Sequence, residues 1–307
     1  MNKLQVNKLH SLTGHRDCVY TLQPAGIPNI FFSGAGDGMV VKWDLENTEN
    51  GEVIAKLPNS VYALHAMPGT DLLIAGHNYE GIHVLDWKNK KEIGSLQLTT
   101  AAIFDIQSHG DFIFVVTGDG ALIKVGKQLS VLSEIRRSEK SARTMAINSK
   151  TGELAVGYSD YFIRVFDLDT LQLKYEWQAH MNSVFTIRYS PDYNFLFSGS
   201  RDARLKVWDV KAGYLQTAEV VAHLYAINHV EFSPDHKHFV TCSMDKSIKV
   251  WNTEELKLLK VIDKARHAGH GTSVNKLLWT SYNNQLVSAS DDRSISIWNF
   301  NFDHHEL

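Results

Sequence analysis

The chain has 307 residues, 44% of them hydrophobic, and 31 Lys and Arg against 34 Asp and Glu give a formal charge of -3. This near balance, without a Lys/Arg-rich run, disfavours electrostatically driven binding to nucleic acid. No apolar run approaches the length of a membrane-spanning helix, and residues 1–12 lack the apolar centre of a signal peptide. The two cysteines, Cys18 and Cys242, favour a reducing compartment, and hence an intracellular, cytoplasmic protein, and exclude a disulfide framework.

Taken in chain order, the sequence predicts short strands separated by turns. The first strand is predicted over residues 3–12, before the first Gly-His pair. Residues 183–189 are rich in β-branched and aromatic residues, and residues 204–208 alternate between apolar and polar positions, both of which are typical of strands. Residues 253–262 have a helix-like composition, but their place in the repeat described next predicts a strand. The sequence therefore predicts an all-β fold.

A twelve-residue pattern recurs along the chain. Four copies end on Trp followed by Asp or Asn, and they read SGAGDGMVVKWD, SGSRDARLKVWD, TCSMDKSIKVWN and SASDDRSISIWN. Three weaker copies put Leu85, Val125 and Phe166 at the Trp position. The Trp positions are thus residues 43, 85, 125, 166, 208, 251 and 298. Seven such units fill residues 1–307 and predict a single domain.

A repeat of this kind predicts a closed ring. Four short strands per unit bury little surface alone, so the units must stack face to face, and closure of the stack protects the terminal units. The chain starts with a strand-like run and ends soon after Trp298. We therefore expect residues 3–12 to form the outer strand of the seventh unit and to hide two open sheet edges. The predicted fold is a seven-bladed β-propeller with four antiparallel strands per blade.

Four units carry His, a hydroxyl residue, Asp and Trp in a fixed register. In each unit the Asp follows the His by 22 residues, and the Trp follows the Asp by six. Trp only donates a hydrogen bond, carboxylate only accepts, and imidazole and hydroxyl do both, so the four groups can form one satisfied chain. The predicted structural tetrads are His15, Ser33, Asp37 and Trp43; His180, Ser198, Asp202 and Trp208; His223, Thr241, Asp245 and Trp251; and His270, Ser288, Asp292 and Trp298.

These features resemble the WD-repeat family of β-propellers, whose unit carries a Gly-His pair, a turn Asp and a Trp-Asp pair. The resemblance covers essentially the whole chain. Units two to four depart from the family pattern, because other and mostly apolar residues stand at the tetrad positions. These residues are Leu57, Ala75 and Leu85; Gln97, Val115 and Val125; and Ser138, Val156 and Phe166.

The resemblance implies a partner-binding surface on the narrow face of the propeller. In the family, the residue five after the tetrad His starts the innermost strand beside the central channel. The matching residues are Tyr20, Tyr62, Phe104, Arg143, Phe185, Asn228 and Asn275. Their aromatic members predict a recognition cup for a peptide or protein, with Arg143 available for an acidic group, and Phe104 and Phe185 could clasp a cation. The alternative is that the aromatics merely plug the channel mouth.

The function that we expect is a non-enzymatic interaction module, or scaffold. The strand starts carry no acidic set. In a Ser-His-Asp arrangement here, the Ser hydroxyl would be hydrogen-bonded to the Trp indole and would not be free to act as a nucleophile. A propeller enzyme with metal ligands or acid/base pairs in the channel is the first alternative. A nucleic-acid-binding propeller is the second.

We expect no cofactor and no metal site. The histidines of residues 236–238, 267–270 and 304–305 lack Cys or carboxylate partners at ligand spacing. The expected partner is a protein or peptide, with neither nucleic acid nor membrane involved. The chain is expected to be monomeric by itself and available for assembly into a larger complex.

Overall fold

The computed structural model describes residues 4–302. Blade one contains β2 (Val19–Pro24), β3 (Ile30–Ala35), β4 (Met39–Asp44) and β5 (Asn47–Lys56). Blade two contains β6 (Leu64–Ala66), β7 (Leu72–His77), β8 (Gly81–Asp86) and β9 (Lys91–Gln97). Blade three contains β10 (Ile103–His109), β11 (Phe112–Thr117), β12 (Ala121–Val125) and β13 (Val131–Arg136). Blade four contains β14 (Ala142–Asn148), β15 (Glu153–Tyr158), β16 (Phe162–Asp167) and β17 (Leu173–Gln178).

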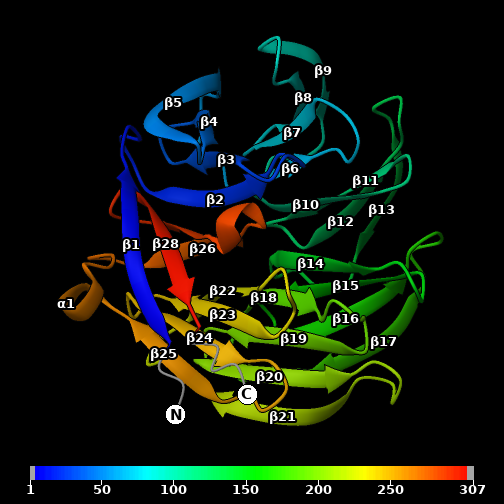
Figure 1. Cartoon of the computed structure of the whole chain (residues 1–307). Coiled ribbons are helices and arrows are strands. Elements are labelled where there is room, and N and C mark those ends of the chain that lie inside the picture. The colour runs from blue at the N-terminus through cyan, green and yellow to red at the C-terminus, as the bar shows by residue number, and fades with distance from the viewer. Residues whose placement is uncertain (1–3, 303–307) are drawn as a thin grey trace.

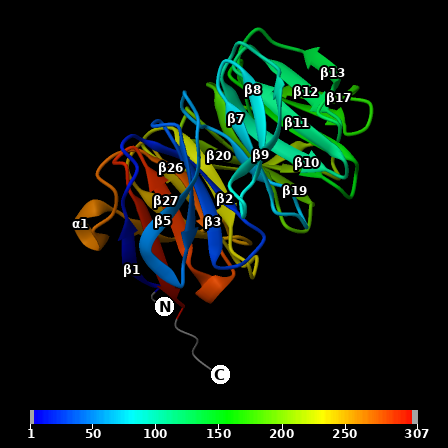
Figure 2. The same ribbon diagram turned by 90° about the horizontal axis from the view of Figure 1, so that it is seen from above.

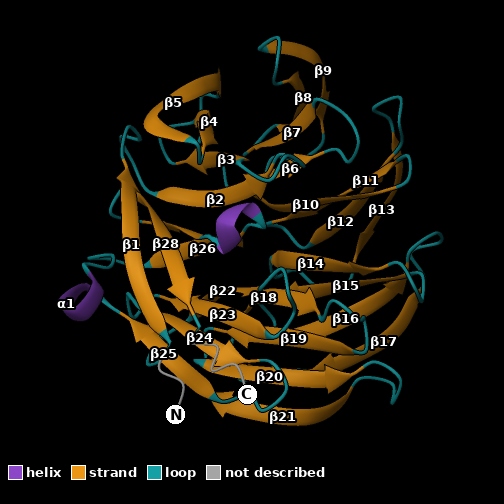
Figure 3. Ribbon diagram, viewed as in Figure 1, coloured by secondary structure: helices purple, strands orange, loops and turns teal. Residues whose placement is uncertain are grey.

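The second half of the chain continues the pattern. Blade five contains β18 (Val184–Tyr189), β19 (Phe195–Ser200), β20 (Arg204–Asp209) and β21 (Leu215–Val221). Blade six contains β22 (Ile227–Phe232), β23 (His238–Ser243), β24 (Ile248–Asn252) and β25 (Leu258–Ile262). Blade seven contains β26 (Val274–Trp279), β27 (Leu286–Ser290), β28 (Ile295–Asn301) and β1 (Gln5–Leu12). Within residues 4–302, helix is confined to α1 (Lys264–His267) and the 3-10 turn η1 (Tyr282–Asn284) (Figure 3).

The seven four-stranded sheets stand in a ring, as predicted. In Figure 1 the innermost strands β2, β6, β10, β14, β18, β22 and β26 surround the centre, and the fourth strand of each blade lies at the rim. The view turned by 90° shows β1 and β13 on opposite sides of the ring (Figure 2). Residues 253–262, predicted as a strand, form β25 after a turn. The seven-bladed fold is confirmed.

The ring is closed by pairing between the two ends of the described chain. β1 runs antiparallel to β28, from Gln5 opposite Asn301 to Leu12 opposite Ile295. Val6 and Leu12 of β1 are buried in the apolar clusters on either side of blade seven. The predicted closure is confirmed, although Lys3, the first residue of the predicted strand, lies outside the described residues.

The core lies between the blades. Seven apolar clusters each combine side chains from two neighbouring blades. The blades approach closely at Gly199, where an added Cβ would lie 2.7 Å from the Ile227 side chain of the next blade. Because real Cβ contacts are longer, glycine is required here for the observed packing.

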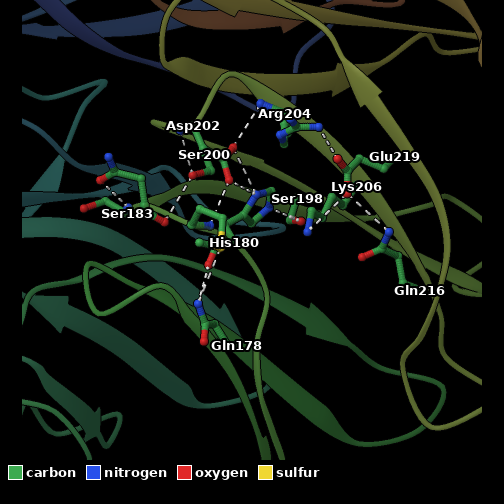
Figure 4. Close-up of polar contacts among 12 residues, drawn as sticks. Gln178, His180, Ser183, Ser198, Ser200, Asp202, Arg204, Lys206, Gln216 and Glu219 are labelled. Carbon is green, nitrogen blue, oxygen red and sulfur yellow. Dashed lines mark hydrogen bonds and ion pairs between the residues drawn. The ribbon is translucent and has the colours of Figure 1, made fainter.

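The tetrad residues are hydrogen-bonded in the predicted order. Figure 4 shows His180, Ser198 and Asp202 of the blade-five tetrad. The Trp208 indole donates to Ser198 Oγ (2.9 Å), and Ser198 lies 2.8 Å from His180 Nε2. His180 Nδ1 in turn lies 3.0 Å from Asp202 Oδ2, which also accepts from the Met181 N–H. Burial alone would raise the pKa of Asp202, but the bonds from His180 and from main-chain N–H groups lower it to about 2.

Blades one, six and seven have the same network, with His-to-hydroxyl distances of 2.7–2.8 Å and Trp-to-hydroxyl distances of 2.8–3.0 Å. In blades two to four the corresponding strand positions are buried and apolar. They are Ala75, Leu85, Val115, Val125, Val156 and Phe166. At these positions, blades two to four are therefore stabilised by apolar packing alone, whereas the other four blades also have a hydrogen-bonded tetrad.

Deleting residues 1–12 should cause aggregation or a large loss of stability. The deletion removes β1, leaves blade seven incomplete and exposes the outer edge of β28. The measurements are thermal melting and size-exclusion chromatography of the truncated and full chains. A truncated chain that stays monomeric and melts at the same temperature would contradict the assigned role of β1.

His180→Ala should lower the free energy of unfolding by about 1–3 kcal/mol, because it leaves Ser198 and Asp202 without their buried partner. Ser138→Ala is the matched control at the same position of blade four, where the network is absent, and should be nearly silent. Urea denaturation of both variants measures the difference. Equal losses would show that the tetrad does not stabilise blade five.

Candidate functional site

The seven predicted site residues all line one cavity of about 230 Å³ at a single mouth of the channel. Each is partly exposed. Six of them are the residues that the strand register skips where the first and second strands of a blade pair: Tyr20, Phe104, Arg143, Phe185, Asn228 and Asn275. A β-bulge redirects a side chain and is common beside binding sites. The bulges thus explain why these side chains converge on the cavity.

The aromatic residues form a continuous row across the mouth, which we call the cup. The Tyr20 and Tyr62 rings meet edge to face at 4.8 Å, and Tyr62 stacks on Phe104 at 5.8 Å. The Arg143 guanidinium then lies between Phe104, at 4.7 Å, and Phe185, at 5.0 Å. The cation that lies between the two phenylalanines is the chain's own Arg143.

The polar members hold the cup rigid. Arg143 Nε donates to Ser159 Oγ (2.6 Å), and Asn228 Nδ2 donates to the Val274 carbonyl (2.8 Å) of the next blade. Asn275 Nδ2 donates to the Val19 carbonyl (2.9 Å), next to Tyr20, and to Asp291 Oδ1 (2.7 Å). The bonds from Asn228 and from Asn275 to main-chain carbonyls connect neighbouring blades, whereas those to Ser159 and Asp291 lie within one blade. They fix the cup before any partner arrives, which reduces the entropy cost of binding.

The charges around the cup are separated by sign. Asp291 contacts Asn275, and Asp17 lies near Tyr20, whose pKa is raised by burial and by its neighbours Cys18, Tyr62 and Asp17. On the blade-four and blade-five side, burial and the nearby exposed Arg201 lower the pKa of Arg143. Asp17 and Asp291 thus lie on the blade-one and blade-seven side of the mouth, and Arg143 and Arg201 lie on the blade-four and blade-five side.

Beneath the cup the channel is lined by charged residues that the sequence analysis missed. Asp105, His229 and Lys276 each follow a cup residue directly, and Arg188 and Glu231 lie further along β18 and β22. They border a second cavity, of about 540 Å³, that extends from the cup toward the turn after β2. The strand starts themselves carry no acidic residue, but acidic and basic residues follow them along the strands. Titratable residues at the second and fourth positions, counted from the cup residue, are the signal that could have revealed them.

These channel residues are engaged with the chain itself. Asp105 Oδ2 accepts the Met145 N–H (2.8 Å) of the next blade, and His229 Nδ1 accepts the Leu277 N–H (3.3 Å). Arg188 Nη2 donates to Glu231 Oε1 (2.6 Å). Burial raises the pKa of Asp105 and Glu231 and lowers the pKa of Lys276 and His229. Their observed contacts link blades, which is a structural use of charge.

An exposed apolar rim adjoins the cup on blades five and six. Met181 and Leu224 directly follow the tetrad histidines of these blades, and their side chains are 72% and 83% exposed. Tyr225, which follows Leu224, and Met244, in the turn after β23, are also exposed. Each main-chain N–H of Met181 and Leu224 binds a tetrad Asp, which places the rim on the face that carries the cup. Exposed apolar groups of this kind mark interaction surfaces.

Comparison with known protein families matches four segments to the repeat described as "WD domain, G-beta repeat", at residues 6–44, 171–209, 215–252 and 262–299. Together these segments make up half of the chain. The chain belongs to the WD40 repeat family. The four matched repeats are those that carry complete tetrads, and the apolar tetrad positions of blades two to four lie in the unmatched residues 45–170.

Several curated WD40 relatives are similar over part of their length. The Denticleless protein homolog of Gallus gallus is 39% identical over 66 residues, which are 20% of this chain and 9% of that protein. WD repeat-containing protein SL1-17 of Schistosoma mansoni is 23% identical over 211 residues, 69% of this chain and 57% of that protein. Striatin-3 of Homo sapiens is 22% identical over 207 residues, 65% of this chain and 22% of that protein. The chain thus spans only part of each relative.

No helix within residues 4–302 has the length and apolar character needed to cross a membrane. Both cysteines, Cys18 and Cys242, are free.

Proposed function

We propose that this WD40 propeller is a non-enzymatic interaction module that binds a segment of a partner protein in the cup. WD40 propellers generally mediate protein–protein interactions. The observation that carries the proposal is the row formed by Tyr20, Tyr62, Phe104, Arg143 and Phe185, which is continuous, partly exposed and rigidly held. Partly open aromatic groups in a preformed pocket are typical anchors for a partner's side chains.

The size of the cavity favours a peptide anchor. A cavity of about 230 Å³ is smaller than most small-molecule sites, and one or two inserted side chains would fill it. The apolar rim on blades five and six offers further contact area for the residues that flank the anchor. An intracellular partner segment of several residues therefore fits the surface better than a cofactor does.

The separated charges give the partner an orientation. An acidic group of the partner would lie toward Arg143 and the exposed Arg201, and a basic group toward Asp17 and Asp291. Complementary charges at the edge of an interface steer association and fix its register more than they add affinity. We propose a partner segment that is apolar at its centre and bears opposite charges on its two sides.

The charged channel does not favour the enzyme alternative. Asp105, His229 and Glu231 accept or pair with groups of the chain itself, so the contacts of these residues are accounted for without a substrate. We propose that these charges link the blades around the channel and thereby support the cup above them.

Tyr62→Ala and Phe104→Ala should each cost about 2 kcal/mol of partner affinity, roughly a 30-fold loss, because few aromatic anchors dominate such interfaces. The melting temperature should barely change, since both residues are partly exposed. Partners recovered from the native cell with the wild-type chain, and lost with the double variant, are then titrated in purified form. Tyr175→Ala is the control, because Tyr175 lies on β17, the outer strand of blade four and away from the cup. If a folded double variant retained every partner, the interface would lie outside the cup and the proposal would be refuted.

Arg201→Glu should weaken a partner whose acidic group lies on the basic side of the mouth, mainly by slowing association, and the loss should shrink at high salt. Arg143→Glu should weaken it further, because that charge lies inside the cup. Stopped-flow or surface-based kinetics at two salt concentrations provide the measurement. Asp17→Lys is the matched reversal on the opposite side, and equal effects of all three changes would refute the proposed orientation.

A further inference from the structure

Blade two carries two histidines and a glutamate that converge on one point away from the cup. His77 ends β7, Glu80 lies in the turn that follows, and His83 lies in β8. One ligand atom from each of His77, Glu80 and His83 lies within 4.8 Å of the other two. The sequence analysis did not consider these residues, which follow a His-x-x-Glu-x-x-His spacing.

The distances suit a tetrahedral metal ion. Two ligands at zinc–nitrogen distances of about 2.0–2.1 Å and the tetrahedral angle lie roughly 3.3 Å apart. His77 Nδ1 and His83 Nε2 are 3.2 Å apart. Glu80 Oε2 lies 2.5 Å from His77 Nδ1, and a small outward movement of this half-exposed side chain would accept an ion between them. The two rigid strand residues are thus already at ligand spacing.

The surroundings of the histidines supply acceptors for their outer nitrogens. Glu92 Oε1 lies 3.3 Å from His83 Nδ1, which has no aligned hydrogen bond, so this carboxylate can accept that N–H and leave the Nε2 lone pair facing the convergence point. The Asn59 side-chain amide lies 3.4 Å from His77 Nε2. The Asn59 Nδ2 atom also donates to the Asn78 carbonyl (3.3 Å). Rotating the amide by half a turn would give up that bond, present the amide oxygen to an Nε2–H and free Nδ1 as a ligand.

We propose that blade two binds a zinc ion through His77 Nδ1, His83 Nε2 and the Glu80 carboxylate, with the fourth position open to water. Two imidazoles and one carboxylate are a familiar zinc ligand set, whereas magnesium and calcium prefer oxygen ligands alone. His77 is buried and the Glu80 side chain is 52% exposed, so the ion would enter from the Glu80 side. The ion would clamp the β7–β8 turn of a blade that has no tetrad.

The clamped turn includes Asn78, which connects two neighbouring segments. Asn78 Nδ2 donates to the Ser60 carbonyl (2.8 Å), and Asn78 Oδ1 accepts the Ile103 N–H (2.8 Å). Ordering of this turn by the ion should therefore also stabilise the contact between blades two and three. This consequence does not depend on the identity of any partner.

The test is calorimetric titration of the untagged, chelator-treated full chain with zinc chloride. One ion should bind per chain, with micromolar or tighter affinity, and should raise the melting temperature. His83→Ala and Glu80→Gln should each weaken binding at least tenfold and abolish the rise in melting temperature. His236→Ala, which removes an exposed histidine elsewhere, should change neither.

Cobalt provides a second readout, because a bound Co²⁺ ion in a tetrahedral site with nitrogen ligands absorbs in the visible region. The wild-type and His236→Ala chains should show this absorption at one equivalent, and the His83→Ala chain should not. The proposal fails if zinc does not bind stoichiometrically. It fails equally if folded His83→Ala and Glu80→Gln chains bind zinc as tightly as the wild type.

Discussion

The arrangement of the cup depends on the antiparallel pairing of β1 with β28. This pairing completes blade seven and brings it against blade one, so that Asn275 of β26 can reach the Val19 carbonyl of β2. Contacts around the cup then run from Asn228 through Ser273 to Asn275, and from Tyr20 through the aromatic row to Phe185. Because each blade is fixed only by its two neighbours, an open ring would leave the spacing of the cup residues undefined.

The two halves of the ring are stabilised differently, and the cup lies mainly over one of them. Blades five, six, seven and one are consecutive around the ring and carry tetrads, in which Trp208 and its equivalents donate to a buried hydroxyl. Blades two to four use apolar packing, and they supply Tyr62, Phe104 and Arg143 to the cup. A zinc ion in blade two would add a polar fixed point to this apolar half.

The repeat made the fold predictable, because four blades carry tetrads in one register and the other three keep a similar spacing. Six of the seven strand-start residues could likewise be found by counting five residues from His15 and its equivalents, whereas Phe104 stands seven residues after Gln97. The contacts that these residues make could not be predicted from the sequence. Arg143 reaches two phenylalanines from different blades, and no local pattern records that. The bulges also shift the strand register by one residue, which brought Asp105 and Lys276 to the channel although they stand beside the expected positions. His77, Glu80 and His83 lay outside the repeat signature.

The order in which the chain is synthesised adds a constraint. β1 is synthesised before β28, so the pairing of Gln5 with Asn301 cannot form until Asn301 has left the ribosome. Contacts between residues so distant in sequence form slowly, and the waiting strand exposes its main-chain groups to other chains. Among the strands of the propeller, β1 is thus synthesised first and paired last. A nascent chain of this protein should require protection for longer than a protein of equal size with local pairing.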